Sequence, residues 1–115
     1  MSKVAFTTLL KREDSALSPH FGKAKWIMVL DRETGQVTFE QNTALNGRAV
    51  VEVVVRHGCT EAVFTNIGAG ALRHLEQARI RGWIAPAGVS APQLLERLDR
   101  GELSRAQAHP QDGHP

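Results

Sequence analysis

The stretch that decides the fold is EAVFTNIGAGALRHLEQARIRGW, residues 61–83. Its apolar run at 61–66 predicts a strand, and a glycine-rich turn leads from there into a helical pattern at 68–82 that Gly82 should end. WIAP at 83–86 predicts the next strand. Strand, helix and strand in this order are typical of an α/β protein.

The flanking segments extend this pattern. Three strands of an antiparallel meander are predicted at 3–10, 24–31 and 36–41. RAVVEVVVRHG at 48–58 is ambiguous, because its five valines suit a strand while four of them fit one helical face, and we prefer a helix. The four valines are Val50, Val51, Val54 and Val55. A last helix should start at Ser90, which forms a capping-box pattern with Gln93.

The predicted order is therefore β-β-β-α-β-α-β-α, an α/β fold in which helices cover the faces of a mixed five-stranded sheet. The 115 residues suffice for one domain, which we place at 1–103. Residues 104–115 have no core pattern, and we expect a mobile C-terminal tail there. The tail histidines, His109 and His114, are candidates for weak metal binding.

Composition narrows the function classes. No apolar run approaches the roughly 20 residues of a membrane-spanning helix, and MSKVAFTTLL lacks the features of a secretory signal. We therefore expect a cytoplasmic protein that does not bind a membrane. The formal net charge of +2 and the 5% aromatic content provide neither a basic stripe nor a stacking surface, so we expect no nucleic-acid partner.

The single cysteine, Cys59, excludes an intramolecular disulfide and a cysteine-rich zinc site. It precedes the strand at 61–66 and so belongs at the sheet edge opposite His20, where we expect a small buried residue. A separate metal site that pairs His57 with Cys59, across a dimer, is a minor alternative. His74 falls on the polar side of its predicted helix, and we expect it in solvent.

Three loops should meet at one edge of the sheet. They contain PHFGK at 19–23, TNIGAG at 65–70 and APAGVS at 85–90. If the later strands run parallel to the first, their carboxyl ends share the edge where the 11–24 loop lies, and ligands of open α/β sheets bind at such edges. Glycines at a helix start let backbone N–H groups approach an anion, which the helix dipole also favours.

Structural roles compete with ligand binding at these loops. His20 could cap its loop or act as a metal ligand, and Phe21 could be a hydrophobic anchor. Asn66 could cap the following helix, and the glycines could only shape turns. Lys23 and Lys25 add positive charge or only solubility.

The same loops carry a family resemblance. LSPHFGKAKWIMVLDRETGQV at 17–37, AVFTNIGAGALRHLEQARIRGW at 62–83 and GVSAPQLLERLDRGEL at 88–103 resemble the dinitrogenase iron–molybdenum cofactor biosynthesis family, with its NifX- and NafY-type carrier domains. The resemblance covers about residues 3–103, and Ser-x-His-Phe-Gly-x-Ala is its most specific motif. It implies a ribonuclease H-like fold without nuclease activity.

The resemblance also implies a non-catalytic carrier for an iron–sulfur or iron–molybdenum cofactor precursor in nitrogenase cofactor biosynthesis. Such clusters are anionic and contain their own sulfides, so one imidazole and backbone amides could hold a cluster loosely for handover. The metal ligand is then His20. The expected cofactor-binding residues are His20, Phe21, Gly22, Lys23, Asn66, Gly68, Gly70 and Gly88. Expected partners are nitrogenase cofactor-assembly proteins or apo-nitrogenase, and the expected state is a monomer or weak homodimer.

Two other functions compete with a carrier. A regulatory or interaction module could bind a partner protein or a small anionic ligand at the same loops. A metal-dependent nuclease of ribonuclease H-like architecture would need clustered acidic residues on the central strands, and the strand at 3–10 has none. The loops also offer no nucleophile with a base and no paired carboxylates, so we expect no enzyme.

Overall fold

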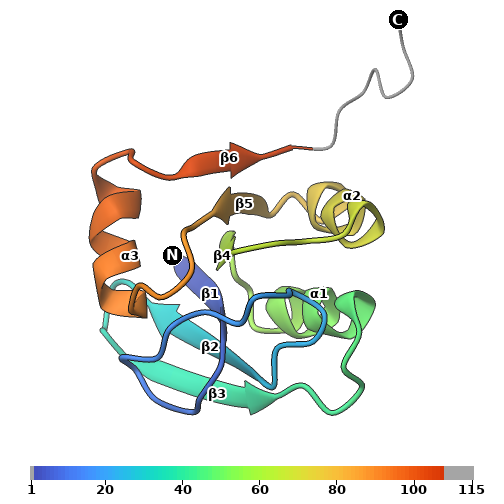
Figure 1. The fold of residues 1–115 in the computed structure, drawn as a ribbon, viewed down its shortest axis with the longest axis horizontal. Coiled ribbons are helices and arrows are strands. Elements are labelled where there is room, and N and C mark those ends of the chain that lie inside the picture. The colour runs from blue at the N-terminus through green and yellow to red at the C-terminus, as the bar shows by residue number, and fades with distance from the viewer. Residues whose placement is uncertain (1, 108–115) are drawn as a thin grey trace, which may run out of the picture.

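A six-stranded mixed sheet runs through the structure, a computed structural model that describes residues 2–107 (Figure 1). The strands are β1 Lys3–Thr8, β2 Trp26–Asp31, β3 Val37–Gln41, β4 Glu61–Phe64, β5 Arg81–Ile84 and β6 Ser104–Ala106, and the helices are α1 Gly47–Arg56, α2 Ala69–Gln77 and α3 Ala91–Asp99. Residue 1 and residues 108–115, which include both tail histidines, lie outside the described residues.

The strand order is β3-β2-β1-β4-β5-β6. β1 runs parallel to β4, and β4 runs parallel to β5, whereas β2, β3 and β6 pair antiparallel with their neighbours. The predicted meander and parallel strands are therefore confirmed. The predicted count of five strands is wrong, because Ser104–Ala106 at the start of the expected tail adds β6 to β5. The ribonuclease H-like label stays a prediction.

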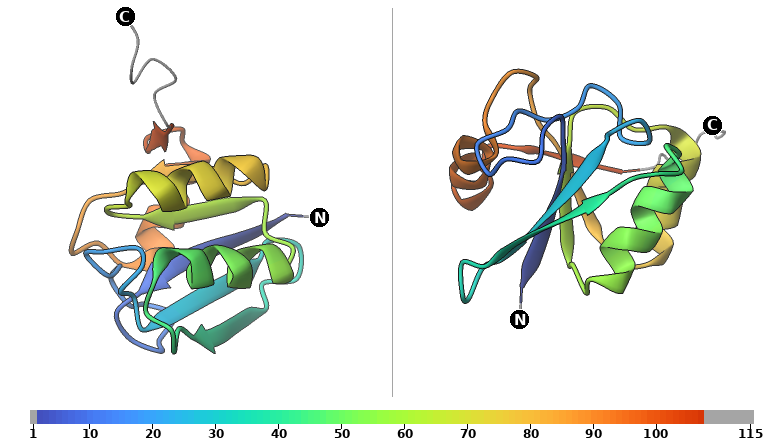
Figure 2. Two further views of the ribbon diagram at one scale, coloured as in Figure 1. Left: turned by 90° about the vertical axis from the view of Figure 1, so that its right-hand side faces the viewer. Right: turned by 90° about the horizontal axis from the view of Figure 1, so that it is seen from below.

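Helices cover both faces of the sheet, α1 and α2 on one side and α3 on the other (Figure 2). Two apolar cores result. One lies between the sheet and the helix pair and contains Phe21, Phe64 and Leu75, and the other lies under α3 and contains Phe6 and Leu94. In the described part of the chain, no helix is long and apolar enough to cross a membrane.

The valine-rich segment is a helix, as predicted. Asn46 caps α1 by accepting the backbone N–H of Ala49 at 2.8 Å, which satisfies one of the free donors at the helix start. The predicted apolar face is wrong at one position, because Val53 is buried in place of Val55, whose side chain is 49% exposed.

One predicted helix boundary and one predicted helix cap are wrong. α2 ends at Gln77 rather than at Gly82, because Arg79 adopts a positive φ of 62° and turns the chain. Gly82 lies instead within β5, where a Cβ would come within 2.8 Å of the Phe64 ring. α3 does begin after Ser90, but the Ser90 hydroxyl contacts the side chain of Gln93 and does not cap the backbone.

Glu61 links several elements at the edge opposite to the loops after β1, β4 and β5. Its side chain is almost buried, accepts a hydrogen bond from the Trp83 indole at 3.0 Å, and lies 3.7 Å from Arg32 and 3.5 Å from Arg81. Arg32 also pairs with Asp99 of α3. One carboxylate thus joins the end of β2, β4, β5 and, through Arg32, α3.

We expect Glu61→Gln to lower the free energy of unfolding by about 2 kcal/mol, because a nearly buried carboxylate loses the charge that pairs with two arginines. Urea denaturation followed by circular dichroism measures the loss. Glu33→Gln is the matched control, since Glu33 is exposed in the β2–β3 turn and should change stability by less than about 0.5 kcal/mol. Equal stability of both variants would show that the Glu61 contacts do not stabilise the fold.

Candidate functional site

The loops that follow β1, β4 and β5 meet at one edge of the sheet, which faces the viewer in Figure 1. We call residues 9–25, 65–70 and 85–91, which include the first residues of α2 and α3, the loop edge. The first loop contacts both others: Phe21 donates its backbone N–H to the Asn66 carbonyl at 2.9 Å, and Ala91 donates to the Ser15 carbonyl at 3.0 Å. The predicted convergence of the three loops is confirmed.

Phe21 anchors the first loop in the core. Its ring is 1% exposed and packs edge to face on Phe64, with ring centroids 5.3 Å apart and an interplanar angle of 81°. The next residue, Gly22, runs against the start of α1, where a Cβ would lie only 2.7 Å from the backbone nitrogen of Gly47. The buried Asn42 side chain donates to the Gly22 carbonyl at 3.1 Å. The Phe64 ring, the start of α1 and the Asn42 side chain therefore all hold the loop in place.

His20 lies on the outside of the anchored loop. The buried Ser18 hydroxyl donates to the His20 carbonyl at 3.0 Å and accepts the His20 N–H at 3.3 Å, so the backbone beside the imidazole is held in place. The ring itself is exposed, and no hydrogen bond or ion pair within residues 2–107 engages it. Lys23 is exposed two residues beyond Phe21. The structure therefore presents this imidazole to solvent with its nitrogens free.

Asn66, Gly68 and Gly70 bring the start of α2 next to this loop, and all three are exposed. The interpretation of Asn66 as a helix cap is wrong, because Gly68 is the N-cap residue and provides no side-chain cap. Asn66 instead accepts the Phe21 N–H with its carbonyl. The backbone N–H groups of the first turn of α2 thus lie at the loop edge beside the His20 loop.

The glycines of the loop edge fall into two groups. Gly22 has no room for a side chain, and Gly88 has a positive φ of 81° that favours glycine. Gly68 and Gly70 have neither constraint, because neither has a positive φ and nothing lies within 4 Å of a Cβ at either position. Gly68 is the N-cap of α2, a position that glycine suits much better than alanine, so of these four glycines folding leaves Gly70 unexplained.

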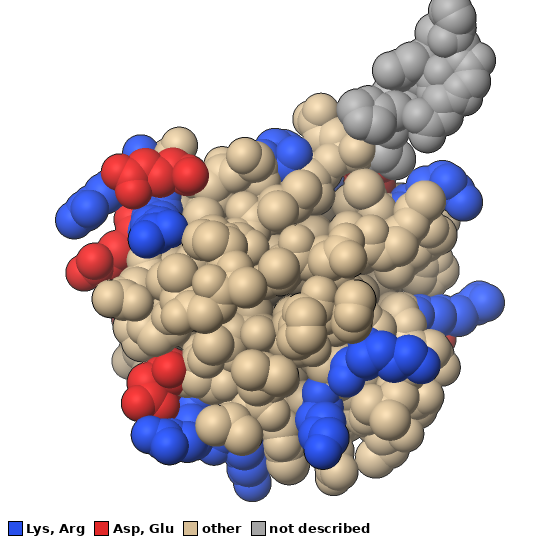
Figure 3. All heavy atoms as spheres, in the orientation of Figure 1, with Lys and Arg blue, Asp and Glu red and all other residues tan. Residues whose placement is uncertain are grey.

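The centre of the loop edge carries no charge. Residues 15–22, 65–72 and 82–92 contain no Asp, Glu, Lys or Arg. Figure 3, which shows this face, has an uncharged middle with Lys and Arg around its rim and most of the visible Asp and Glu on the α3 side. An anion at the centre of this edge would meet backbone donors and distant positive charge, while the acidic residues of the first loop, Glu13 and Asp14, lie outside that centre in the sequence.

At the opposite edge of the sheet, Cys59 is buried and His57 is paired with a carboxylate, so neither is exposed and unpaired as His20 is. Cys59 is 7% exposed, and burial raises the pKa of its thiol to about 11, so the predicted buried cysteine is confirmed. His57 places its Nε2 atom 2.8 Å from Glu40, whose pKa is lowered to about 2 by hydrogen bonds from Arg56 and then from His57. Among the described residues, no three His, Cys, Asp or Glu side chains form a group that could hold a metal ion.

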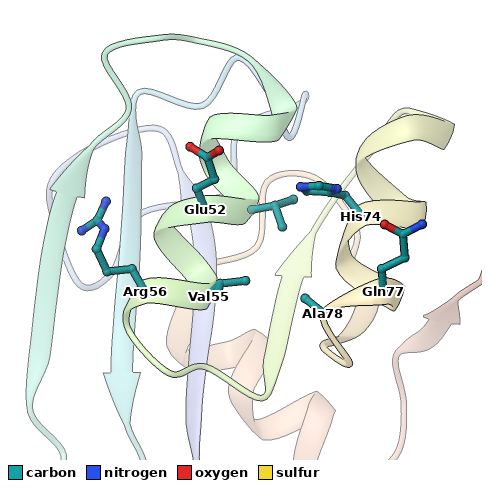
Figure 4. Close-up of a pocket in the computed structure, with 7 residues that line it drawn as sticks. Glu52, Val55, Arg56, His74, Gln77 and Ala78 are labelled. Carbon is teal, nitrogen blue, oxygen red and sulfur yellow. The ribbon is translucent and has the colours of Figure 1, made fainter.

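A groove between α1 and α2 was not predicted (Figure 4). It has a volume of about 410 Å³ and is lined by Val51, Glu52, Val55, Arg56, His74, Gln77 and Ala78. The expectation that His74 lies in solvent is wrong, because its half-buried ring forms part of this groove. One residue in the sequence could have indicated this groove. It is Val55, a fifth valine in α1 that is not part of the buried face of the helix.

Comparison with known families identifies the chain. The family model for the dinitrogenase iron-molybdenum cofactor matches residues 2–101. The chain belongs to this family. Membership relates the chain to nitrogen fixation and cofactor biosynthesis. The matched residues include every element from β1 to α3. No curated protein matches the chain at a significant level.

Two solved structures have the same fold as this family member. The apo form of the orange protein from Desulfovibrio gigas aligns with a TM-score of 0.87 at 23% identity, over 94% of this chain and 95% of that one. A Thermotoga protein provisionally assigned as NifB, in the DUF35 family, aligns with a TM-score of 0.83 at 23% identity, over 98% of this chain and 100% of that one. At this level of identity, the likeness shows the fold alone.

We expect Gly22→Ala to lower the free energy of unfolding by about 2 kcal/mol, because its Cβ would press on the backbone at the start of α1. Gly70→Ala is the matched control, since open space surrounds that position and it lies inside a helix. Thermal unfolding should separate the two variants by several degrees. Equal melting temperatures would contradict the close approach of the first loop to α1.

Proposed function

We propose that this protein is a non-catalytic carrier that binds an anionic iron–sulfur or iron–molybdenum cofactor precursor at the loop edge, with His20 as its metal ligand. The cargo would pass to nitrogenase cofactor-assembly proteins or apo-nitrogenase in the cytoplasm. Family membership supports a cofactor precursor as the cargo, and the geometry of the loop edge supports this edge as the binding site.

The observation that carries this proposal is the pairing of a free imidazole with a glycine, Gly70, that folding does not require. The Phe21–Asn66 hydrogen bond holds the His20 loop beside the start of α2. Glycine in a helix costs about 1 kcal/mol relative to alanine, so Gly70 lowers stability without any gain inside the molecule. Close approach of a ligand to the helix start would account for this cost.

The chemistry of the cargo suits this arrangement. A cluster that contains its own sulfides needs few protein ligands, and an imidazole nitrogen is a good ligand for iron. The amides at the start of α2 would donate to an anionic cluster, and Lys23 would add positive charge. In this proposal Gly88, Asn66, Gly68 and Gly70 contact the cargo, while Phe21 and Gly22 hold the loop.

The direct test is an anaerobic titration of the full chain with isolated cofactor or its precursor, followed by electronic absorption. We expect saturable binding that His20→Ala weakens at least tenfold, because the metal ligand is lost. His74→Ala is the control, since this histidine lies in the α1–α2 groove, and it should bind as the parent chain does.

Two results would contradict the carrier proposal. If His20→Ala binds the cluster as tightly as the parent chain does, His20 is not a ligand of the cluster. No cluster uptake, together with saturable thermal stabilisation by inorganic phosphate, would favour the module that binds a small anion at the same loops.

The glycine argument makes a separate prediction. Gly70→Ala should raise the free energy of unfolding by about 0.5 to 1 kcal/mol through helix propensity, and yet weaken cluster binding several-fold by crowding the start of α2. Denaturation and the same titration measure the two effects. Gln77→Ala, at the far end of this helix, should leave cluster affinity unchanged. If Gly70→Ala binds the cluster with the affinity of the parent chain, the cluster does not approach the helix closely at Gly70.

A further inference from the structure

Two strands form the outer edges of the sheet, β3 and β6. The edges differ in length, since β6 has three residues and β3 has five. Figures 1 and 2 show β3 at the margin of the sheet, with no further strand or helix along its outer side. An exposed edge strand offers unpaired N–H and C=O groups to which another strand can bind.

The pairing of β3 with β2 determines which backbone groups remain free. Asn42 donates its N–H to the Lys25 carbonyl at 2.8 Å. Asp31 donates its N–H to the Gln36 carbonyl at 2.9 Å. Because hydrogen-bonded pairs alternate along an antiparallel ladder, the even-numbered residues of β3 bond to β2. The backbone groups that point outward are those of Val37, Phe39 and Gln41.

This edge lacks the features that usually prevent strand addition. The sequence VTFEQ contains no Lys, Pro or Gly. Its one charged residue, Glu40, is paired with Arg56, which donates two hydrogen bonds of 2.8 Å to it. Val37 and Phe39 are half-buried, and Val37 borders an apolar hollow of about 190 Å³ under α3. A strand added to β3 would therefore gain both backbone bonds and apolar contact.

We propose that β3 pairs antiparallel with β3 of a second copy of this chain, about a two-fold axis at Phe39. In this register Phe39 faces Phe39 of the second copy, Val37 faces Gln41, and Thr38 faces Glu40. Each copy gives the outward groups of the same three residues, so the edge is self-complementary. A register that places Glu40 opposite Glu40 would bring like charges together and is disfavoured.

This pairing has consequences for the dimer. Antiparallel strands point the two loop edges in opposite directions, so both candidate sites stay open and the interface does not depend on the carrier function. Five residues a side make a small interface, which gives a weak dimer that depends on protein concentration.

Sedimentation velocity of the full chain from micromolar to millimolar concentration tests the pairing. We expect the weight-average mass to rise from the monomer value of 12.6 kDa toward twice that value. Gln41→Pro should stay monomeric, because it removes one outward N–H without removing a bond to β2. Gln41→Ala keeps that N–H and should dimerise as the parent chain does.

A second variant locates the interface independently of proline. Phe39→Cys places two thiols on the two-fold axis, where hydrogen-bonded partners have Cα atoms about 5.5 Å apart, within the range of a disulfide. Mild oxidation should then give a covalent dimer. Val55→Cys, in the α1–α2 groove, and the parent chain with its buried Cys59 should not cross-link.

Three results would overturn the proposal. One is a parent chain that stays monomeric at millimolar concentration. The second is association of Gln41→Pro equal to that of Gln41→Ala. The third is cross-linking of Val55→Cys but not of Phe39→Cys, which would assign the contact to the groove between α1 and α2.

Discussion

The edge-to-face contact between Phe21 and Phe64 is the constraint on which the loop edge depends. Phe64 is the last residue of β4, so a ring packed on it ties the long loop after β1 to the carboxyl end of the neighbouring parallel strand. The adjacent Phe21 N–H then reaches the Asn66 carbonyl just before α2. With Phe21 turned into the core, His20 is left outside, and its position relative to the start of α2 follows from the packing of one residue.

Some glycines near the loop edge are required by packing, and another has no such requirement and is assigned to the proposed binding site. Gly22 and Gly82 are explained by close neighbours, a backbone in one case and the Phe64 ring in the other. Gly68 is the N-cap of α2, whereas Gly70 lies inside this helix with open space around it and without a positive φ. Residues that lower stability without a structural reason are expected at functional sites. The loop edge thus combines a rigidly held loop with a helical glycine that lowers stability, which fits the proposed ligand site.

Much of this arrangement could be predicted from the sequence, because periodicity and strand direction act over short distances. The helix at the valine run, the meeting of three loops and the burial of Cys59 follow from spacing and topology. β6 could not be predicted, since three residues with one buried alanine, Ala106, are too short for a pattern. The place of His74 depends on how closely the two helices pack, and a Cβ at Gly47 would lie 2.8 Å from Ala71, which no local pattern reveals.

The central claim is that cargo binds at the loop edge through His20. Nitrogen-15 NMR of the uniformly labelled chain, titrated anaerobically with the cofactor precursor, tests it most directly. The account predicts that amide signals of residues 17–22, 65–70 and 85–90 shift or broaden together, with the imidazole nitrogens of His20 affected most. Changes confined to the α1–α2 groove, or to Cys59 and His57 at the opposite edge, would contradict it.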